Sequence, residues 1–196
     1  VNDAPVLLEI GNQVTDEDVA ISIPLSAEDV DNVELNFSAS SDNSAVTVTV
    51  DGDQLSMTSS LNYNGLANIT VTVSDGFLTD EETFILTVSP VNDPPLITLP
   101  ESFMFSEDNE LVVPFDDYLS DIDEDLLTLT VSGNANILVE IINFEVTLAS
   151  EENWNGTEML TFSVNDNQGR AIASDDVNVI VTPVNDAPVL SEIGNQ

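Results

Sequence analysis

Short runs of alternating hydrophobic and polar residues make up most of this chain. Ile69, Val71 and Val73, for example, alternate with threonines, as expected for a strand that is buried on one face. The runs are rich in Val, Ile, Thr and Phe, and turn-forming Asp, Asn, Gly and Ser separate them. No stretch keeps helical spacing. The pattern therefore predicts an all-β chain of short antiparallel strands.

The expected strands fall into two sets of seven. The first set is expected at 6–10, 19–25, 33–39, 45–50, 54–59, 67–74 and 82–88. The second set is expected at 96–105 (interrupted), 111–115, 126–132, 137–142, 144–149, 158–164 and 176–182. Seven short strands in about 90 residues are typical of an immunoglobulin-like Greek-key β-sandwich. We therefore predict two tandem sandwiches stacked end to end.

A five-residue string, Val-Asn-Asp-x-Pro, occurs at 1–5, 91–95 and 184–188. It divides the chain into a first repeat at 1–90, a second at 91–183 and the first strand of a truncated third repeat at 184–196. An isolated strand is not stable alone. We therefore expect the tail at 189–193 to pack against a neighbouring chain or to continue as an extended arm.

Further short motifs recur in both repeats. The matching pairs are Glu17-Asp18 with Glu107-Asp108, Asp29-x-Asp31 with Asp121-x-Asp123, Asn62 to Gly65 with Asn153 to Gly156, and Asp75 with Asp166. If the strands run alternately down and up, the Asp-x-Asp loop and the Asp75 loop lie at the end of the sandwich where the chain enters. The Glu-Asp and Asn-Gly motifs then lie at the opposite end.

The charge balance favours divalent cations as partners. The chain has 37 acidic side chains against one basic side chain, a formal net charge of −36, yet 42% of its residues are hydrophobic, so we expect it to fold. Such a chain cannot neutralise phosphates, which excludes nucleic acid. It has no histidine and no cysteine, which removes most catalytic and transition-metal chemistry, and we expect no enzyme activity. No apolar run reaches about 20 residues, so no direct membrane insertion is expected.

Stacking the two sandwiches would bring six oxygen donors together at the central junction. These donors are Glu17, Asn92, Asp93, Asp121, Asp123 and Asp166. Calcium takes about six to eight oxygen ligands with tolerant geometry, so we predict Ca²⁺ here. Incomplete sites are expected at the two outer copies of the string. The N-terminal half site comprises Asn2, Asp3, Asp29, Asp31 and Asp75, and the C-terminal half site comprises Glu107, Asn185 and Asp186.

Each of these motifs also has a simpler explanation. An Asp-x-Asp loop is common turn chemistry, and a Glu-Asp pair before a strand can be a polar bend. Tyr63 and Trp154 precede Asn-Gly, where packing against the core is favoured over a platform for sugars. Four aromatic residues occur only in the second repeat, where core packing is favoured over an exposed patch. They are Phe103, Phe105, Phe115 and Tyr118.

These motifs resemble the bacterial cadherin-like tandem repeats of large surface and secreted adhesins. The resemblance covers nearly the whole chain and rests on Asn2 to Pro5, Thr15 to Asp18, Asp29 to Asp31, Asn62 to Gly65 and Val73 to Gly76. It implies calcium held between successive domains, neighbouring repeats as partners, and an extracellular or cell-surface location. Animal cadherins have a related layout, with a leading Asp in the linker and an acidic triplet in the loop before the sixth strand, and they bind up to three calcium ions between domains. Two motifs of this chain depart from that layout, which implies one or two ions per junction and a Kd of roughly 0.1 to 1 mM. They are Ser89-Pro90 before the linker and Asn62-Tyr63-Asn64.

Two functions remain open at this point. The first is a calcium-rigidified extender that supports cell adhesion by displaying a binding domain located elsewhere in the protein. The alternative is a carbohydrate- or protein-binding cadherin-like module attached to a secreted polysaccharide-degrading enzyme, with polysaccharide or a cell-surface protein as partner. An exposed, coplanar aromatic patch would favour the alternative.

Overall fold

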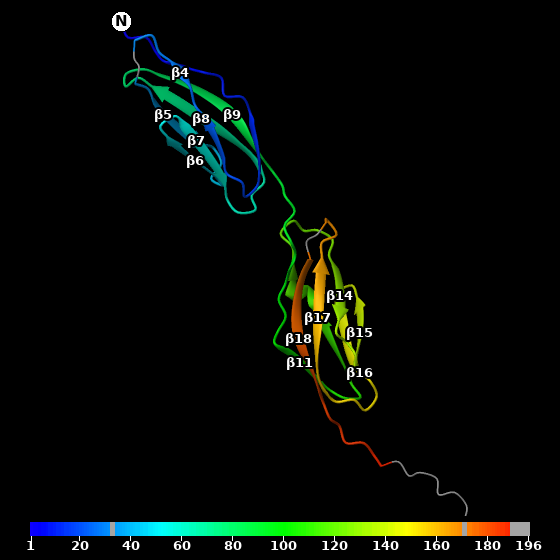
Figure 1. Ribbon diagram of the computed structural model, residues 1–196. Helices are drawn as coiled ribbons and strands as arrows, with labels where there is room; N and C mark the ends of the chain where they lie inside the picture. The colour runs from blue at the N-terminus through cyan, green and yellow to red at the C-terminus, as the bar shows by residue number, and fades with distance from the viewer. Residues whose placement is uncertain (32–33, 170–171, 189–196) are drawn as a thin grey trace, which may run out of the picture. The chain divides into compact units, whose positions relative to one another are not determined.

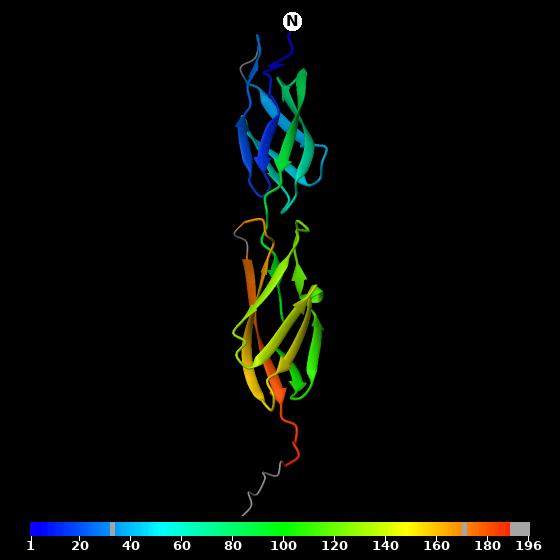
Figure 2. The ribbon, with the colours of Figure 1, turned by 90° about the vertical axis from the view of Figure 1, so that its right-hand side faces the viewer.

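The chain forms two units, each with its own hydrophobic core (Figures 1 and 2). Our structure is a computed structural model that describes residues 1–31, 34–169 and 172–188. Unit 1 comprises Val1–Val91, and unit 2 begins at Asn92. Within the described residues, almost all regular structure is β-strand, which confirms the predicted all-β fold.

The described part of unit 1 contains nine strands. They are β1 (Val6–Leu7), β2 (Gln13–Asp16), β3 (Ile21–Pro24), β4 (Ala27–Glu28), β5 (Asn36–Ser41), β6 (Val46–Asp51), β7 (Gln54–Ser59), β8 (Gly65–Ser74) and β9 (Thr79–Ser89). One sheet has the order β2-β9-β8-β5 and the other has the order β3-β7-β6. The short strands β1 and β4 pair with each other outside these sheets.

Unit 2 repeats this arrangement. Its elements are β10 (Leu96–Ile97), β11 (Ser102–Ser106), β12 (Glu110–Pro114), the 3-10 helix η1 (Phe115–Tyr118), β13 (Leu119–Ser120), β14 (Thr128–Ser132), β15 (Ile137–Ile142), β16 (Glu145–Ser150), β17 (Gly156–Asn165) and β18 (Ile172–Thr182). Its sheets have the orders β11-β18-β17-β14 and β12-β16-β15, and β10 pairs with β13.

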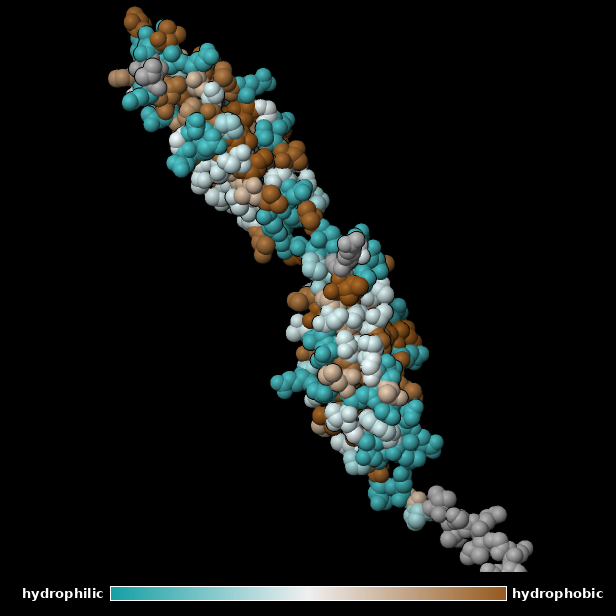
Figure 3. All heavy atoms as spheres, in the orientation of Figure 1, coloured by the Kyte–Doolittle hydropathy of each residue, from teal (hydrophilic) through white to brown (hydrophobic). Residues whose placement is uncertain are grey.

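Period-two alternation decides which side of each strand is buried. In β8, Ile69, Val71 and Val73 are fully buried, whereas Thr70 faces outward and shares a 2.8 Å hydroxyl contact with Thr83 of β9. Unit 2 follows the same rule, and its outward sheet face over β17 and β18 is mainly white and teal in Figure 3. On the outward face of this sheet, hydroxyl groups also pair across neighbouring strands, as those of Ser163 and Ser174 do at 2.7 Å.

The core of unit 2 is built around aromatic rings. The centroids of Phe115 and Phe162 are 4.6 Å apart and both rings are fully buried. Phe103 and Tyr118 pack edge-on or tilted around Phe115. Phe105 is buried as well. The expectation that these aromatic residues serve the core is confirmed.

The two aromatic residues before Asn-Gly also pack against the cores, as predicted. Tyr63 accepts a hydrogen bond from Asn43 and donates one to the carbonyl of Leu66. In unit 2 the Trp154 ring lies over Gly156, where a Cβ would be only 3.3 Å from Cζ2 of Trp154. Gly156 also has a φ of +152°, so the position requires glycine for two reasons.

The first strand region of each sandwich changes sheets part of the way along. In unit 1 it begins as β1 and continues as β2, which runs parallel to the last strand, β9. The pattern did not predict β2, because Val14 points outward and the run starts with polar residues. The expected strand end at Phe115 is also wrong, since a 3-10 helix begins there.

From the end of β1 to the start of β2, carboxylate side chains accept hydrogen bonds from the backbone. The amide of Leu7 donates to Asp80 Oδ2 at 2.8 Å, and the amide of Ile10 donates to both oxygens of Glu82 at 3.0 and 3.1 Å. In unit 2 the amide of Leu99 donates to Asp175 at 2.8 Å. The last strand thus holds the first segment through its side chains.

Replacing Glu82 tests this role. Because Glu82→Ala leaves the Ile10 amide without its acceptor, we expect the free energy of unfolding of unit 1 to fall by about 1 to 3 kcal/mol. The neighbouring Glu81 is exposed, so Glu81→Ala is the control and should change it by less than about 0.5 kcal/mol. Urea denaturation measures both variants, and equal effects would contradict the assigned role.

The expectations for the tail at 189–193 fall outside the described residues. The structure therefore describes the third copy of the string only as far as Pro188.

Candidate metal centre

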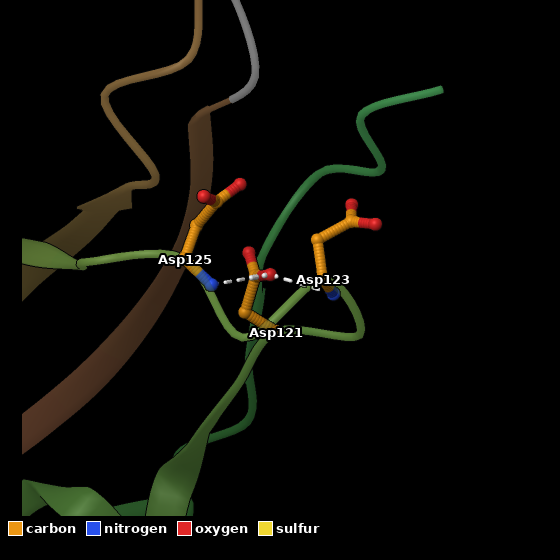
Figure 4. A group of neighbouring side chains, drawn as sticks. All are labelled: Asp121, Asp123 and Asp125. Atoms are coloured by element: carbon orange, nitrogen blue, oxygen red, sulfur yellow. Dashed lines mark hydrogen bonds between the residues drawn. The ribbon is translucent and has the colours of Figure 1, made fainter. Parts of the chain in front are cut away.

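Three carboxylates gather in the loop that follows β13 of unit 2 (Figure 4). One oxygen from each of Asp121, Asp123 and Asp125 lies within 4.8 Å of the others. The loop is shaped by Asp121, whose Oδ1 accepts the backbone amides of Asp123 at 3.0 Å and Asp125 at 3.3 Å. This turn is one that Asp forms readily, and it places the three side chains side by side.

The linker residues lie against the same loop. The backbone amide of Asp93 donates to Asp123 Oδ2 at 2.8 Å. The side-chain amide of Asn92 donates to Asp166 Oδ2 at 2.7 Å. The five predicted residues that belong to unit 2, from Asn92 to Asp166, are therefore at one end of this sandwich, as the repeat motifs predicted.

Asp166 is only 1% exposed and lies in the loop after β17. Hydrogen bonds from the Asn92 side chain and from the Gln168 backbone amide hold the pKa of Asp166 below its ordinary value. Gln168 also donates from its side chain to Asp125 Oδ1 at 2.8 Å. Hydrogen bonds therefore connect three segments, namely the linker, the Asp166 loop and the Asp121 loop.

The lowered pKa of Asp166 has a testable consequence. A carboxyl group whose pKa is depressed by folding stabilises the protein above its unfolded pKa, and that contribution is lost as the pH falls through the folded pKa. Because Asn92 is the largest cause, we expect Asn92→Ala to raise the pKa of Asp166 towards its ordinary value. NMR titration of the Asp166 carboxyl carbon measures this, and an unchanged pKa would contradict the cause.

The donor set suits a hard divalent cation. All of these groups are oxygen donors, and the whole chain has only one basic side chain to offset its carboxylates. Within the described part of the chain, Asp121 Oδ2 is buried and accepts no hydrogen bond, an arrangement that is costly for a carboxylate without a cation. The residues present therefore fit a calcium ion.

Unit 1 has the same arrangement at its own N-terminal end. The Asn2 side chain donates to Asp75 at 2.6 Å, and the Asp3 amide donates to Asp31 at 2.9 Å. The Asp31 amide donates to Asp29 Oδ1 at 2.7 Å. The five residues of the predicted N-terminal half site thus lie together.

The two glutamates lie at the opposite ends of their units, as predicted. Glu17 is 4% exposed and its Oε1 accepts the amide of Val91, the last residue of unit 1. Glu107 is 3% exposed and accepts the amide of Val184 with Oε1 and the side chain of Asn155 with Oε2. Each glutamate therefore holds the chain where it leaves the sandwich.

Asn185 and Asp186 are exposed beyond Val184, and the Asn185 side chain donates to the Asp186 carbonyl at 3.2 Å. Glu17 belongs to unit 1 and the Asp121 cluster belongs to unit 2. That Glu17 completes this cluster therefore stays a prediction.

Asp125 and Gln168 are the members of this site that the sequence motifs missed. In the first repeat Val33 stands at the position of Asp125, so a comparison of the repeats discards it. The signal was present in the second repeat alone, as the acidic run from Asp121 to Asp125.

The described residues contain no exposed aromatic platform. Phe77, which is 86% exposed, is the one aromatic residue among them that is not at least partly buried. A single ring cannot form the coplanar pair expected for stacking on a sugar chain. None of the described residues belongs to a helix long and apolar enough to cross a membrane.

Solved structures share the fold at low sequence identity. Cadherin domains EC1-2 of human protocadherin-24 match with a TM-score of 0.58 and 20% identity, over 93% of this chain and all of that one. Cadherin domains 1-4 of protocadherin gamma B7 match with a TM-score of 0.53 and 16% identity, over 95% of this chain and 53% of that one.

An endo-fucoidan hydrolase from glycoside hydrolase family 107 matches over 92% of this chain but only 29% of its own length, with 16% identity and a TM-score of 0.39. No curated protein matches the sequence. The family model for the bacterial Ig domain matches twice, at residues 2–87 and 92–182. Domains of this kind are non-catalytic modules that usually occur in extracellular proteins. The chain therefore belongs to the bacterial Ig domain family, as two tandem copies with cadherin-like structural relatives.

Proposed function

We propose that the chain is a pair of calcium-binding repeats from a large extracellular adhesin, in which calcium stiffens the chain between successive domains. The observation that carries the proposal is the cluster of Asp121, Asp123 and Asp125, with the buried Asp121 Oδ2 that no described group hydrogen-bonds. Calcium would supply the positive charge that this loop lacks.

The residues that would hold the ion come from three segments. Asp121, Asp123 and Asp125 supply the loop carboxylates, Asp166 supplies a carboxylate from the loop after β17, and Asp93 supplies oxygen from the linker. Linker residues Asn92 and Asp93 are already hydrogen-bonded to the Asp166 and Asp121 loops. An ion bound there would hold them more firmly, and Val91 of unit 1 is peptide-bonded to Asn92. Calcium would thus leave fewer freely moving residues between the two units.

Calorimetric titration of the metal-free chain tests the site directly. We expect calcium to bind with a Kd on the order of 0.1 to 1 mM, and magnesium to bind more weakly because it gives up its water reluctantly. Asp123→Ala should remove the central site and leave binding at the N-terminal half site. Asp31→Ala is the matched variant and should have the converse effect. A titration that neither variant changes would overturn the proposal.

One distance measurement and one variant test the mechanical part of the proposal. Fluorescence labels placed on the two units should report a narrower distribution of distances in calcium than in chelator. Glu17→Gln tests whether unit 1 contributes a ligand, since it removes the charge and keeps the oxygen that accepts the Val91 amide. If Glu17 is a ligand, this variant weakens calcium binding, whereas an unchanged Kd would confine the site to unit 2.

The alternative function is a carbohydrate- or protein-binding module, and its carbohydrate-binding form lacks the aromatic surface that it would need among the described residues. Display of a binding domain located elsewhere in the protein is therefore the better supported role.

A further inference from the structure

The peptide bond between Asp93 and Pro94 differs chemically from its counterparts in the other copies of the string. An aspartate carboxyl group can reach its own backbone carbonyl carbon by closing a five-membered ring. A following proline makes the bond easier to break, because its nitrogen departs as a basic secondary amine. Ala4 and Ala187 stand at the corresponding positions, and Asp-Pro occurs at no other place in the sequence.

The structure adds a hydrogen-bond donor at the carbonyl of this bond. Asn92 Nδ2 donates to the carbonyl oxygen of Asp93 at 3.2 Å. The same amide donates to Asp166 Oδ2 at 2.7 Å, which fixes its orientation. A donor aimed at a carbonyl oxygen stabilises the negative charge that develops there when the carbon is attacked.

The backbone on the other side of the residue is held as well. The Asp93 amide donates to Asp123 Oδ2 at 2.8 Å, so hydrogen bonds fix both the amide and the carbonyl of Asp93. A backbone held in this way loses less freedom on ring closure than a free peptide does.

We propose that Asp93–Pro94 is a self-cleaving bond, broken by the Asp93 carboxyl group with the assistance of the Asn92 side-chain amide. An oxygen of the carboxyl group attacks the Asp93 carbonyl carbon and forms a cyclic anhydride. The bond to nitrogen breaks, and the Pro94 nitrogen takes a proton. Water then opens the anhydride and leaves Asp93 as a C-terminal residue with two carboxyl groups. No oxidant, reductant or metal is required, so the inference does not depend on calcium binding.

The third copy of the string provides an internal control. The Asn185 side chain donates to the Asp186 carbonyl at the same distance, 3.2 Å, but Ala187 follows. Asp186 therefore has the donor without the good leaving group, and it should not be cleaved at a comparable rate.

The test is incubation of the full chain in mildly acidic acetate buffer with chelator, followed by mass spectrometry, with circular dichroism to verify the fold. We expect fragments 1–93 and 94–196 to accumulate, and to form faster than from a synthetic peptide of residues 89–99. Pro94→Ala should reduce cleavage after Asp93 to the level seen after Asp186. The proposal is overturned if the peptide is cleaved as fast as the folded chain, or if Pro94→Ala has no effect.

Asn92→Ala separates assistance from a structural role. Loss of one neutral hydrogen bond to the reacting carbonyl should slow cleavage about five-fold. Asn185→Ala is the matched control and should leave the rate unchanged. If Asn92 only stiffened the linker, Asn92→Ala would slow cleavage no more than Asp123→Ala, which frees the Asp93 amide and keeps the donor at the Asp93 carbonyl. An equal rate for these two variants, or an unchanged rate for Asn92→Ala, would therefore overturn the assigned assistance.

Discussion

Saturating calcium should raise the melting temperature of unit 2 by roughly 10 to 20 °C. Calcium at about 100 times its Kd stabilises a one-site domain by about 2.7 kcal/mol. A domain of this size gains about 4 to 8 °C for each kcal/mol. Asp121→Asn should remove most of this increase, because it removes a charge from the centre of the cluster and keeps the oxygen that shapes the loop.

The same variant should behave differently in chelator. There it relieves repulsion among three neighbouring carboxylates, so its melting temperature should equal or exceed that of the unchanged chain. Asp176→Asn is the matched control, since it removes one charge from the exposed face of β18. Differential scanning calorimetry measures all three proteins. An equal increase with sodium at the same ionic strength would contradict a specific calcium site.

Phe162→Ala should destabilise unit 2 by about 3 to 5 kcal/mol. The Phe162 side chain is 0% exposed and its ring lies against that of Phe115, so truncation removes buried contacts and leaves a cavity in the aromatic core. Unit 1 has a separate core, and its unfolding transition should stay where it is. Urea denaturation followed by NMR signals from each unit measures the two transitions.

Phe77→Ala is the control of the same chemical type. Phe77 is 86% exposed, so its loss should change the free energy of unfolding by less than about 0.5 kcal/mol. If Phe162→Ala lowered both transitions equally, the separation into two independent cores would be contradicted.

The strands with regular alternation were the ones that the sequence predicted best. The expected strand at 54–59 is β7, and the expected strand at 137–142 is β15, residue for residue. The pattern failed where tertiary contacts decide. β2 exists because β9 offers it a parallel partner, and η1 forms where Phe115 turns into the core.

The candidate site was also predicted only in part. Recurrence of Asn-Asp and Asp-x-Asp in both repeats correctly predicted which groups meet within each unit, because loops at one end of a sandwich must lie near one another. Recurrence could not identify Asp125, whose counterpart is Val33. It also could not show that Asp121 Oδ2 is buried, which depends on how the loop folds.

The parallel pairing of first and last strands determines how each sandwich responds to tension. A force that separates the two ends of unit 1 pulls β2 and β9 along their lengths in opposite directions, so the hydrogen bonds of the pair resist together and do not open one after another. Unit 1 has four residue pairs in this ladder, from Gln13 to Asp16, whereas unit 2 has five, from Ser102 to Ser106. Under a steadily rising pull, unit 1 should therefore rupture first, and unit 2 would keep its fold at forces that have already extended its neighbour.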